Sequence, residues 1–164
     1  MNDCMYGYSL KDRVMTQSLI KSGTEPNLTA DQEEHFFTYS LYPHAGTWRE
    51  AGTEQEALNL NVPAKAVAGA AEKDRMEFLS VDKRDVVLET VKKAEDGDGV
   101  IVRLYEVENA RTKVTLHCAE AIASAEETDL LENPIEGALG VKENEIELTI
   151  KPYEIRTIRI RTAK

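Results

Sequence analysis

Hydrophobic and polar residues alternate in short runs along most of this chain, a pattern that predicts β-strands joined by turns. The alternation is cleanest over residues 113–118 and 145–150, where every second residue is aliphatic or cysteine and the intervening residues are polar or charged. Further short runs suited to strands occupy residues 13–20, 78–81, 86–91, 100–107 and 153–160. Strands at this spacing are typical of sandwiches and barrels. The predicted fold class is therefore all-β, as an antiparallel β-sandwich.

An aromatic segment over residues 35–48 stands out from this pattern. It holds five of the ten aromatic residues, and its period of two places Phe37, Tyr39 and Leu41 on one face of an extended strand. Pro43 lacks an N–H and should end the strand. Because aromatic side chains contribute the largest burial terms, the segment is predicted to be an interior strand at which the core nucleates.

A single short helix is predicted near residues 47–60. Thr47 with Glu50, and Thr53 with Glu56, have the spacing of a capping box, and Pro63 should stop the helix. Residues 1–34 are predicted to form a lead-in strand and loops. The stretch 64–71 is interpreted as an extended connection, although a helical turn is an alternative.

Two turns can be predicted in the C-terminal half. The sequence Asp96-Gly97-Asp98-Gly99 separates two apolar runs, and Asp-Gly pairs accept the positive φ angles of a tight hairpin. A calcium loop is the competing interpretation, but the remaining ligand positions of an EF-hand are missing. Near the C-terminus the apolar parity slips between Ile155 and Ile158, which predicts a bulge or bend near Arg156.

Composition limits the possible partners. A chain of 164 residues fits one domain, predicted to span 1–164, and a net charge of −10 argues against nucleic-acid and anionic-membrane partners. No apolar run approaches a membrane span. Cys4 and Cys118 have neither metal-type nor disulfide-framework spacing, which favours a reducing, cytoplasmic setting.

Motifs for catalysis are not found in this sequence. The three histidines, His35, His44 and His117, lack zinc-site spacing, and no nucleophile motif or phosphate-binding loop is present. Glycoside hydrolysis needs two carboxyl groups across the scissile bond, but spacing singles out no pair among thirty acidic residues. No catalytic residue and no metal ligand are assigned in this chain.

Several motifs together resemble one enzyme family. The run 37–46, Phe-Thr-Tyr-Ser-Leu-Tyr-Pro-His-Ala-Gly, followed by Trp48, is similar to the signature that opens the C-terminal β domain of α-mannosidases of glycoside hydrolase family 38. The loop Asn2-Asp3-Cys4 with Tyr6-Gly7-Tyr8 resembles the family's preceding loop. Runs at 91–97, 102–106 and 148–157 match later strands in the same order.

The resemblance implies a role in a larger enzyme. Members of the family hydrolyse α-mannosides with retention, using zinc held by Asp and His residues in a catalytic barrel N-terminal to this region. The resemblance therefore implies that the barrel is this chain's partner, that zinc belongs to the barrel, and that residues 1–164 alone are inactive. The chain itself would need no cofactor.

The resemblance also supplies the candidate site residues. The loop that corresponds to residues 2–8 lies near the cleft between barrel and β domain, so Asp3 and Tyr6 become candidates for contact with an α-mannoside or the barrel. A plain turn built around Gly7 is the alternative. His44 either fixes the turn into the helix or contacts a neighbouring domain or ligand. This sequence departs from the family pattern with Met5 in place of Lys, Phe36 in place of Glu and Thr47 in place of Asp.

Two other functions remain open on the sequence alone. The aromatic segment could belong to an independent carbohydrate-binding module, with Trp48 and tyrosines stacking on sugars. A plain interaction domain with an exposed apolar patch is the other alternative.

Overall fold

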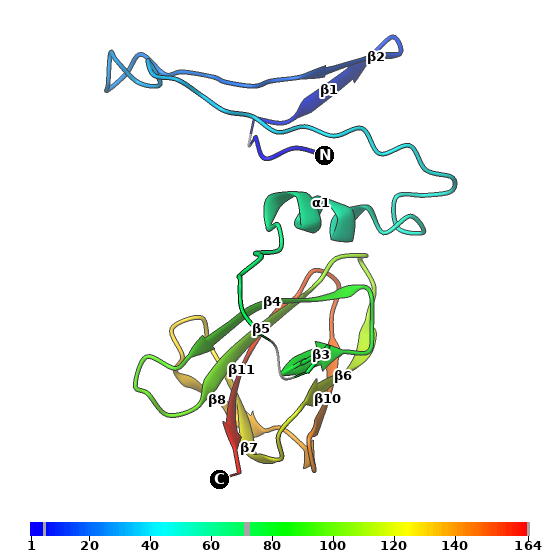
Figure 1. Ribbon diagram of the computed structural model, residues 1–164, viewed down its shortest axis with the longest axis vertical. Helices are drawn as coiled ribbons and strands as arrows, with labels where there is room; N and C mark the ends of the chain where they lie inside the picture. Colours follow the sequence, from blue (N-terminus) through cyan, green and yellow to red (C-terminus); the bar gives the residue numbers. More distant parts are fainter. Residues whose placement is uncertain (5, 71–72, 164) are drawn as a thin grey trace. The chain divides into compact units, whose positions relative to one another are not determined.

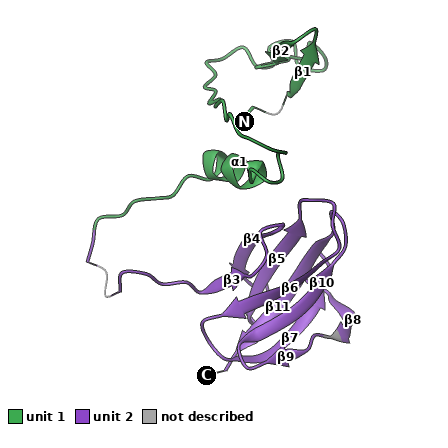
Figure 2. Cartoon of the chain, turned by 90° about the vertical axis from the view of Figure 1, so that its right-hand side faces the viewer, with its two compact units in different colours: residues 1–68 green, residues 69–164 purple. Residues whose placement is uncertain are grey.

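The computed structural model describes residues 1–4, 6–70 and 73–163, which group into two compact units, Met1–Ala68 and Gly69–Lys164 (Figure 2). The prediction that residues 1–164 form one domain stays a prediction.

The second unit is a sandwich of two antiparallel sheets (Figure 1). One sheet has four strands in the order β3 (Leu79–Val81), β6 (Thr112–Cys118), β10 (Glu145–Ile150) and β9 (Val141–Lys142). The other has five strands in the order β4 (Val86–Lys93), β5 (Val100–Glu106), β11 (Ile155–Thr162), β7 (Ile122–Thr128) and β8 (Pro134–Ala138). All strand pairs among the described residues of this unit are antiparallel. The prediction of an all-β sandwich is confirmed.

The hydrophobic core lies between these two sheets. Leu116 on β6 is fully buried and faces Ile146 on β10, while Val102 on β5 faces Ile158 on β11. These side chains belong to one continuous cluster of buried residues. The period-two alternation of the sequence produces this arrangement, because every second side chain points to the same face of a strand.

The predicted hairpin between β4 and β5 is confirmed. The Asp96 carboxylate accepts a hydrogen bond from the Asp98 N–H at 2.9 Å, and Gly97 and Gly99 have φ angles of +81° and +98°. A Cβ atom at Gly99 would lie 2.6 Å from the Ile160 carbonyl oxygen on the neighbouring strand. Glycine is required there both for its dihedral angle and for the close approach of β11.

The predicted bulge near Arg156 is wrong. The register between β11 and β5 runs without interruption from Ile155 to Ile160, and the irregularity with β7 falls later, between Arg161 and Thr162. Ile155 is 56% exposed, so this isoleucine faces away from the core and no change of parity is needed.

The first unit contains a hairpin, a helix and extended segments. The hairpin pairs β1 (Tyr8–Lys11) with β2 (Val14–Gln17). β2 lies within the run 13–20 that was predicted as a strand, whereas β1 precedes that run. The helix α1 (Thr53–Asn61) confirms the single short helix and ends before Pro63. The Thr47–Glu50 capping box does form, since the Glu50 N–H donates to Thr47 Oγ1 at 3.3 Å and the Thr47 N–H donates to Glu50 Oε2 at 2.7 Å.

This capping box closes a turn that precedes the helix. The N-cap of α1 is Gly52, in the left-handed region with φ +64° and no side-chain cap hydrogen bond. The spacing of the sequence allows two starts, and the helix uses the second, at Thr53.

The prediction that the aromatic segment is an interior strand is wrong. No described residue of 1–68 is buried, and Phe36, Tyr39 and Leu41 are 83%, 68% and 79% exposed. The segment is extended, but within the described residues its pairing is limited to one bridge between Tyr39 and Asn2. Burial of an aromatic ring requires a packing partner, and the first unit supplies too little surface to cover these side chains. The core lies in the second unit instead.

Candidate functional site

Asp3 is fixed by the aromatic segment. Its N–H donates to the Thr38 carbonyl at 3.1 Å, and its Oδ1 accepts the Thr38 N–H at 2.8 Å. This hydrogen bond from the Thr38 backbone holds the pKa of the Asp3 carboxyl below its ordinary value. Asp3 is exposed, so the structure presents an ionised carboxylate at the surface of the first unit.

Tyr6 and His44 are also exposed. Tyr6 keeps 46% of its surface accessible. The His44 ring lies tilted against Tyr42 with 5.6 Å between ring centroids, and its Nδ1 lies 3.3 Å from the Ala45 carbonyl oxygen. The assignment of Asp3, Tyr6 and His44 to a substrate or domain interface stays a prediction.

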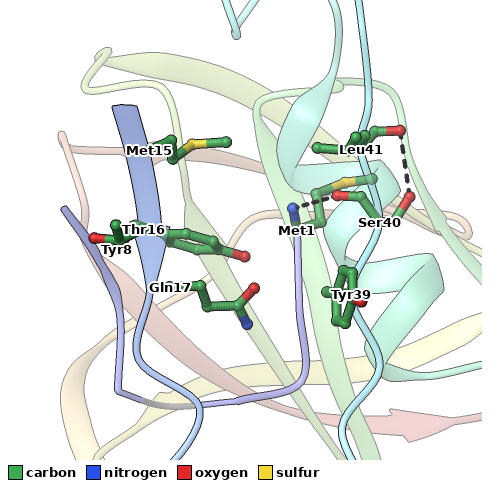
Figure 3. Close-up of a pocket in the computed structure, with 8 residues that line it drawn as sticks. All are labelled: Met1, Tyr8, Met15, Thr16, Gln17, Tyr39, Ser40 and Leu41. Carbon is green, nitrogen blue, oxygen red and sulfur yellow. Dashed lines mark hydrogen bonds between the residues drawn. The ribbon is translucent and has the colours of Figure 1, made fainter. Parts of the chain in front are cut away.

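A pocket of about 290 Å³ lies between the β1–β2 hairpin and residues 39–41. Figure 3 shows Tyr8, Met15 and Gln17 reaching from the hairpin toward Met1 and Tyr39. The Met1 nitrogen donates to the Ser40 carbonyl at 3.0 Å, which holds Met1 against the far wall of the pocket. The lining is formed by Met1, Tyr8, Met15, Thr16, Gln17, Tyr39, Ser40 and Leu41.

The pocket contains an unsatisfied donor. Gln17 Nε2 is buried and has no hydrogen-bond partner within the described part of the chain. A buried amide without a partner is costly, so this group marks a place where an external acceptor would be favourable.

A second hollow, of about 410 Å³, adjoins the first. Both are lined by Met1, Met15, Ser40 and Leu41, and the second also includes His44. Of the three candidate site residues, His44 therefore lines a described hollow, whereas Asp3 and Tyr6 line neither of these two.

The residues that line the pocket were not identified from the sequence, although the sequence contains a signal for two of them. The alternation over residues 13–20 places Met15 and Gln17 on the same face of β2, and the register pairs Tyr8 with Gln17. What the sequence does not show is that this face lies opposite residues 39–41.

Comparison with known proteins identifies the sandwich. Residues 85–158 match the model of the glycosyl hydrolases family 38 C-terminal beta sandwich domain. The chain carries the C-terminal β-sandwich domain of family 38. Its matched residues run from just before β4 into β11 and so include most of the second unit.

Whole-chain relatives agree with this assignment. This chain is 36% identical to alpha-mannosidase 2C1 of Mus musculus, and the aligned region covers 96% of this chain and 16% of the mouse protein. It is 34% identical to alpha-mannosidase G of Dictyostelium discoideum, over 97% of this chain and 15% of that protein. It is 26% identical to alpha-mannosidase of Saccharomyces cerevisiae, over 98% and 17%. The chain thus spans about one sixth of the length of these relatives.

Two polar centres order the loops of the family 38 sandwich. The first is Glu106, which is 1% exposed and accepts backbone N–H groups of Glu108, Asn109, Ala110 and Tyr153 at 2.7–3.0 Å. Burial raises the pKa of this carboxyl, but the four donors together outweigh burial and hold the pKa below its ordinary value. Glu106 therefore acts as a structural anion.

The second polar centre is Arg159, which is 6% exposed on the side of β11 away from the core. It bonds Asp96 in the β4–β5 turn, and its Nη2 donates to the Glu132 carbonyl at 3.3 Å. Glu132 is 7% exposed and also accepts the Lys92 ammonium at 2.8 Å. The hydrogen bond from Lys92 is the largest cause that lowers the pKa of Glu132. This network ties β4, β11 and the β7–β8 loop together.

Neither polar centre is a metal site. Among the described residues, no group of three His, Cys, Asp or Glu side chains is placed to hold an ion. The described part of the chain also contains no helix long and apolar enough to cross a membrane.

Proposed function

We propose that this chain is the non-catalytic C-terminal part of a retaining, zinc-dependent α-mannosidase that hydrolyses α-mannosides. In this proposal the second unit is a scaffold, and the first unit packs against a catalytic barrel and walls its cleft. The family 38 match supports the proposal, as do relatives named α-mannosidases in which this chain corresponds to about one sixth of the length.

The observation that carries the proposal is the contrast between the two units. The second unit has its own core, whereas none of the described residues of the first unit is buried as a whole residue. Exposed apolar surface of this extent marks an interaction site. It includes Tyr6, Tyr8, Leu10, Val14, Met15, Leu28, Phe36, Tyr39, Leu41, Val62 and Val67, each at least 46% exposed.

In this proposal zinc belongs to the barrel, as the resemblance to family 38 implies. When bound in the barrel, zinc would supply Lewis-acid stabilisation of developing negative charge on substrate oxygens. The contribution of this chain would be to position the cleft wall, where the ionised, exposed Asp3 could accept hydrogen bonds from sugar hydroxyls.

A role in mannose metabolism in the cytoplasm belongs to the same proposal. Its support is the state of the two cysteines, since Cys4 and Cys118 are both free thiols in this structure. Free thiols are expected in a reducing compartment.

The test uses residues 1–164 and the longer polypeptide encoded in frame with them. With an aryl α-mannoside, the longer protein should show zinc-dependent turnover that a chelator removes, whereas residues 1–164 should show none with or without zinc. Turnover by residues 1–164 alone would refute the proposed division of labour. A reading frame that encodes no further domain would refute it equally.

A sugar-binding role for the isolated chain is a second candidate, supported by the pocket. Tyr8 and Tyr39 offer two aromatic rings, and Gln17 offers an unsatisfied amide donor. Calorimetric titration with mannose and mannobiose tests this candidate. Saturable heat that is lost in Gln17→Ala but kept in Gln32→Ala, an exposed control, would support it; absence of heat in the wild-type chain would reject it.

A further inference from the structure

The extended segment 37–41 is paired along one edge. Residues 1–3 run antiparallel to it, with the Asp3 N–H bonded to the Thr38 carbonyl at 3.1 Å and the Ser40 N–H bonded to the Met1 carbonyl at 2.8 Å. These two bonds flank the bridge between Asn2 and Tyr39. In an antiparallel ladder, a residue in such a flanked pair turns its own N–H and C=O toward the opposite edge.

The opposite edge is open within the described structure. No hydrogen bond among the described residues engages the N–H groups of Phe37, Tyr39 or Leu41, which alternate with the paired Thr38 and Ser40. The side chains of Tyr39 and Leu41 are also exposed. The segment therefore presents a row of unused backbone donors beside uncovered apolar side chains.

This edge also lacks the features that protect exposed strands. Edge strands usually carry charged residues, Pro or bulges that prevent pairing with another chain. Residues 36–42 read Phe-Phe-Thr-Tyr-Ser-Leu-Tyr, without a charge or a Pro. By contrast, β4 is an edge strand of the five-stranded sheet and carries Glu89, Lys92 and Lys93. Within one chain, the strand that ends a sheet is protected and segment 36–42 is not.

We propose that segment 36–42 is completed by a β-strand from the remainder of the α-mannosidase polypeptide, which pairs with the N–H groups of Phe37, Tyr39 and Leu41. This inference rests on the proposed function and adds the mode of attachment, which is strand addition. The incoming strand carries apolar side chains at alternate positions, to cover Tyr39 and Leu41.

A second copy of the chain is a poorer occupant than the same polypeptide. Each copy of the chain carries a net charge of −10, and like net charges of this size oppose association of two copies. The relatives, in contrast, contain about five sixths of their length beyond the matched region, from which a strand can come.

Hydrogen–deuterium exchange resolved to single residues tests the proposal. In residues 1–164 alone, the amides of Phe37, Tyr39 and Leu41 should exchange rapidly, whereas that of Ser40 should be slower. In the longer polypeptide the three rapid amides should slow by at least about tenfold, since a strand hydrogen bond must open before exchange. An active long protein in which these amides exchange as fast as in the isolated chain would overturn the inference and leave the proposed function standing.

Two substitutions at Tyr39 separate strand pairing from side-chain packing. Tyr39→Pro removes the N–H and the ring, while Tyr39→Ala removes only the ring and serves as the matched control. When residues 1–164 and the rest of the polypeptide are mixed as separate chains, Tyr39→Pro should bind about tenfold more weakly than Tyr39→Ala, the loss expected for one backbone hydrogen bond. Equal affinities of the two variants would overturn strand addition.

Three further outcomes would each count against a proposal. Slow exchange of the three amides in isolated, monomeric residues 1–164 would show that the edge is covered within the chain, which overturns the inference. Slow exchange that appears only as residues 1–164 dimerise in sedimentation would make a second copy the occupant and overturn it too. Failure of wild-type residues 1–164 to bind the rest of the polypeptide would count against the proposed function itself.

Discussion

The Tyr153 N–H donates to Glu106 Oε2 at 2.8 Å, and this hydrogen bond joins the end of β5 to the turn that leads into β11. The two strands are neighbours in the five-stranded sheet, paired from Ile155 and Tyr105 onward. The same carboxylate also holds the turn at residues 108–110. One buried side chain thus fixes two loops at the same end of the sandwich.

Glu106→Ala should destabilise the chain by about 3 kcal/mol, because four backbone N–H groups would lose a charged acceptor in a buried site. Chemical denaturation of both proteins measures the difference in free energy of unfolding. Glu120→Ala removes an exposed carboxylate on the same unit and should change stability by less than about 0.5 kcal/mol. Equal stabilities of Glu106→Ala and the wild type would contradict the anchoring role.

The lowered pKa of Glu106 also predicts how stability depends on pH. A carboxyl whose pKa is lower in the folded state contributes stability above its unfolded pKa, near the ordinary value of 4.5, and loses that contribution as pH falls through the folded pKa. Wild-type stability should therefore fall below about pH 4.5, and Glu106→Gln should show a shallower fall over that range. Thermal melts from the acid range up to neutral pH, with Glu120→Gln as the control, provide the measurement.

Arg159→Ala should cost about 3 kcal/mol, because Glu132 would remain buried with one of its cationic partners removed. Arg159→Met keeps most of the apolar stem and isolates the loss of charge. The double variant Arg159→Met with Glu132→Gln should regain part of the loss, since no uncompensated carboxylate remains. If the double variant is as unstable as the sum of the two single variants, the two residues are not coupled.

The strands of the sandwich can be predicted from sequence largely where alternation is strong. Residues 113–118 and 145–150 correspond to β6 and β10, because half of their side chains are buried against one core and half face solvent. The sequence of β7, Ile-Ala-Ser-Ala-Glu-Glu-Thr, does not predict a strand, since it is poor in β-branched and aromatic residues. It is a strand because it pairs with β11, and that long-range contact leaves no local signal.

For the aromatic segment, in contrast to β7, the sequence predicts the conformation but not the burial. The composition of residues 36–42 identifies an extended, apolar segment correctly, but local sequence does not say which chain covers it. In the described structure the partner on one edge is residues 1–3 and the other edge is open. Met15 and Gln17 could not be identified as pocket residues from sequence for the same reason, because the pocket depends on what lies opposite them.

The location of the core in the second unit makes two large apolar side chains differ in how much they stabilise the chain. Leu116 is fully buried and Phe36 is 83% exposed. Leu116→Ala should destabilise the chain by about 3 kcal/mol, whereas Phe36→Ala should change its stability by less than about 0.5 kcal/mol. In the longer polypeptide Phe36→Ala should become costly, because the proposed barrel contact would bury the ring. A large loss from Phe36→Ala in residues 1–164 alone would mean that the aromatic segment is packed within this chain and needs no outside partner.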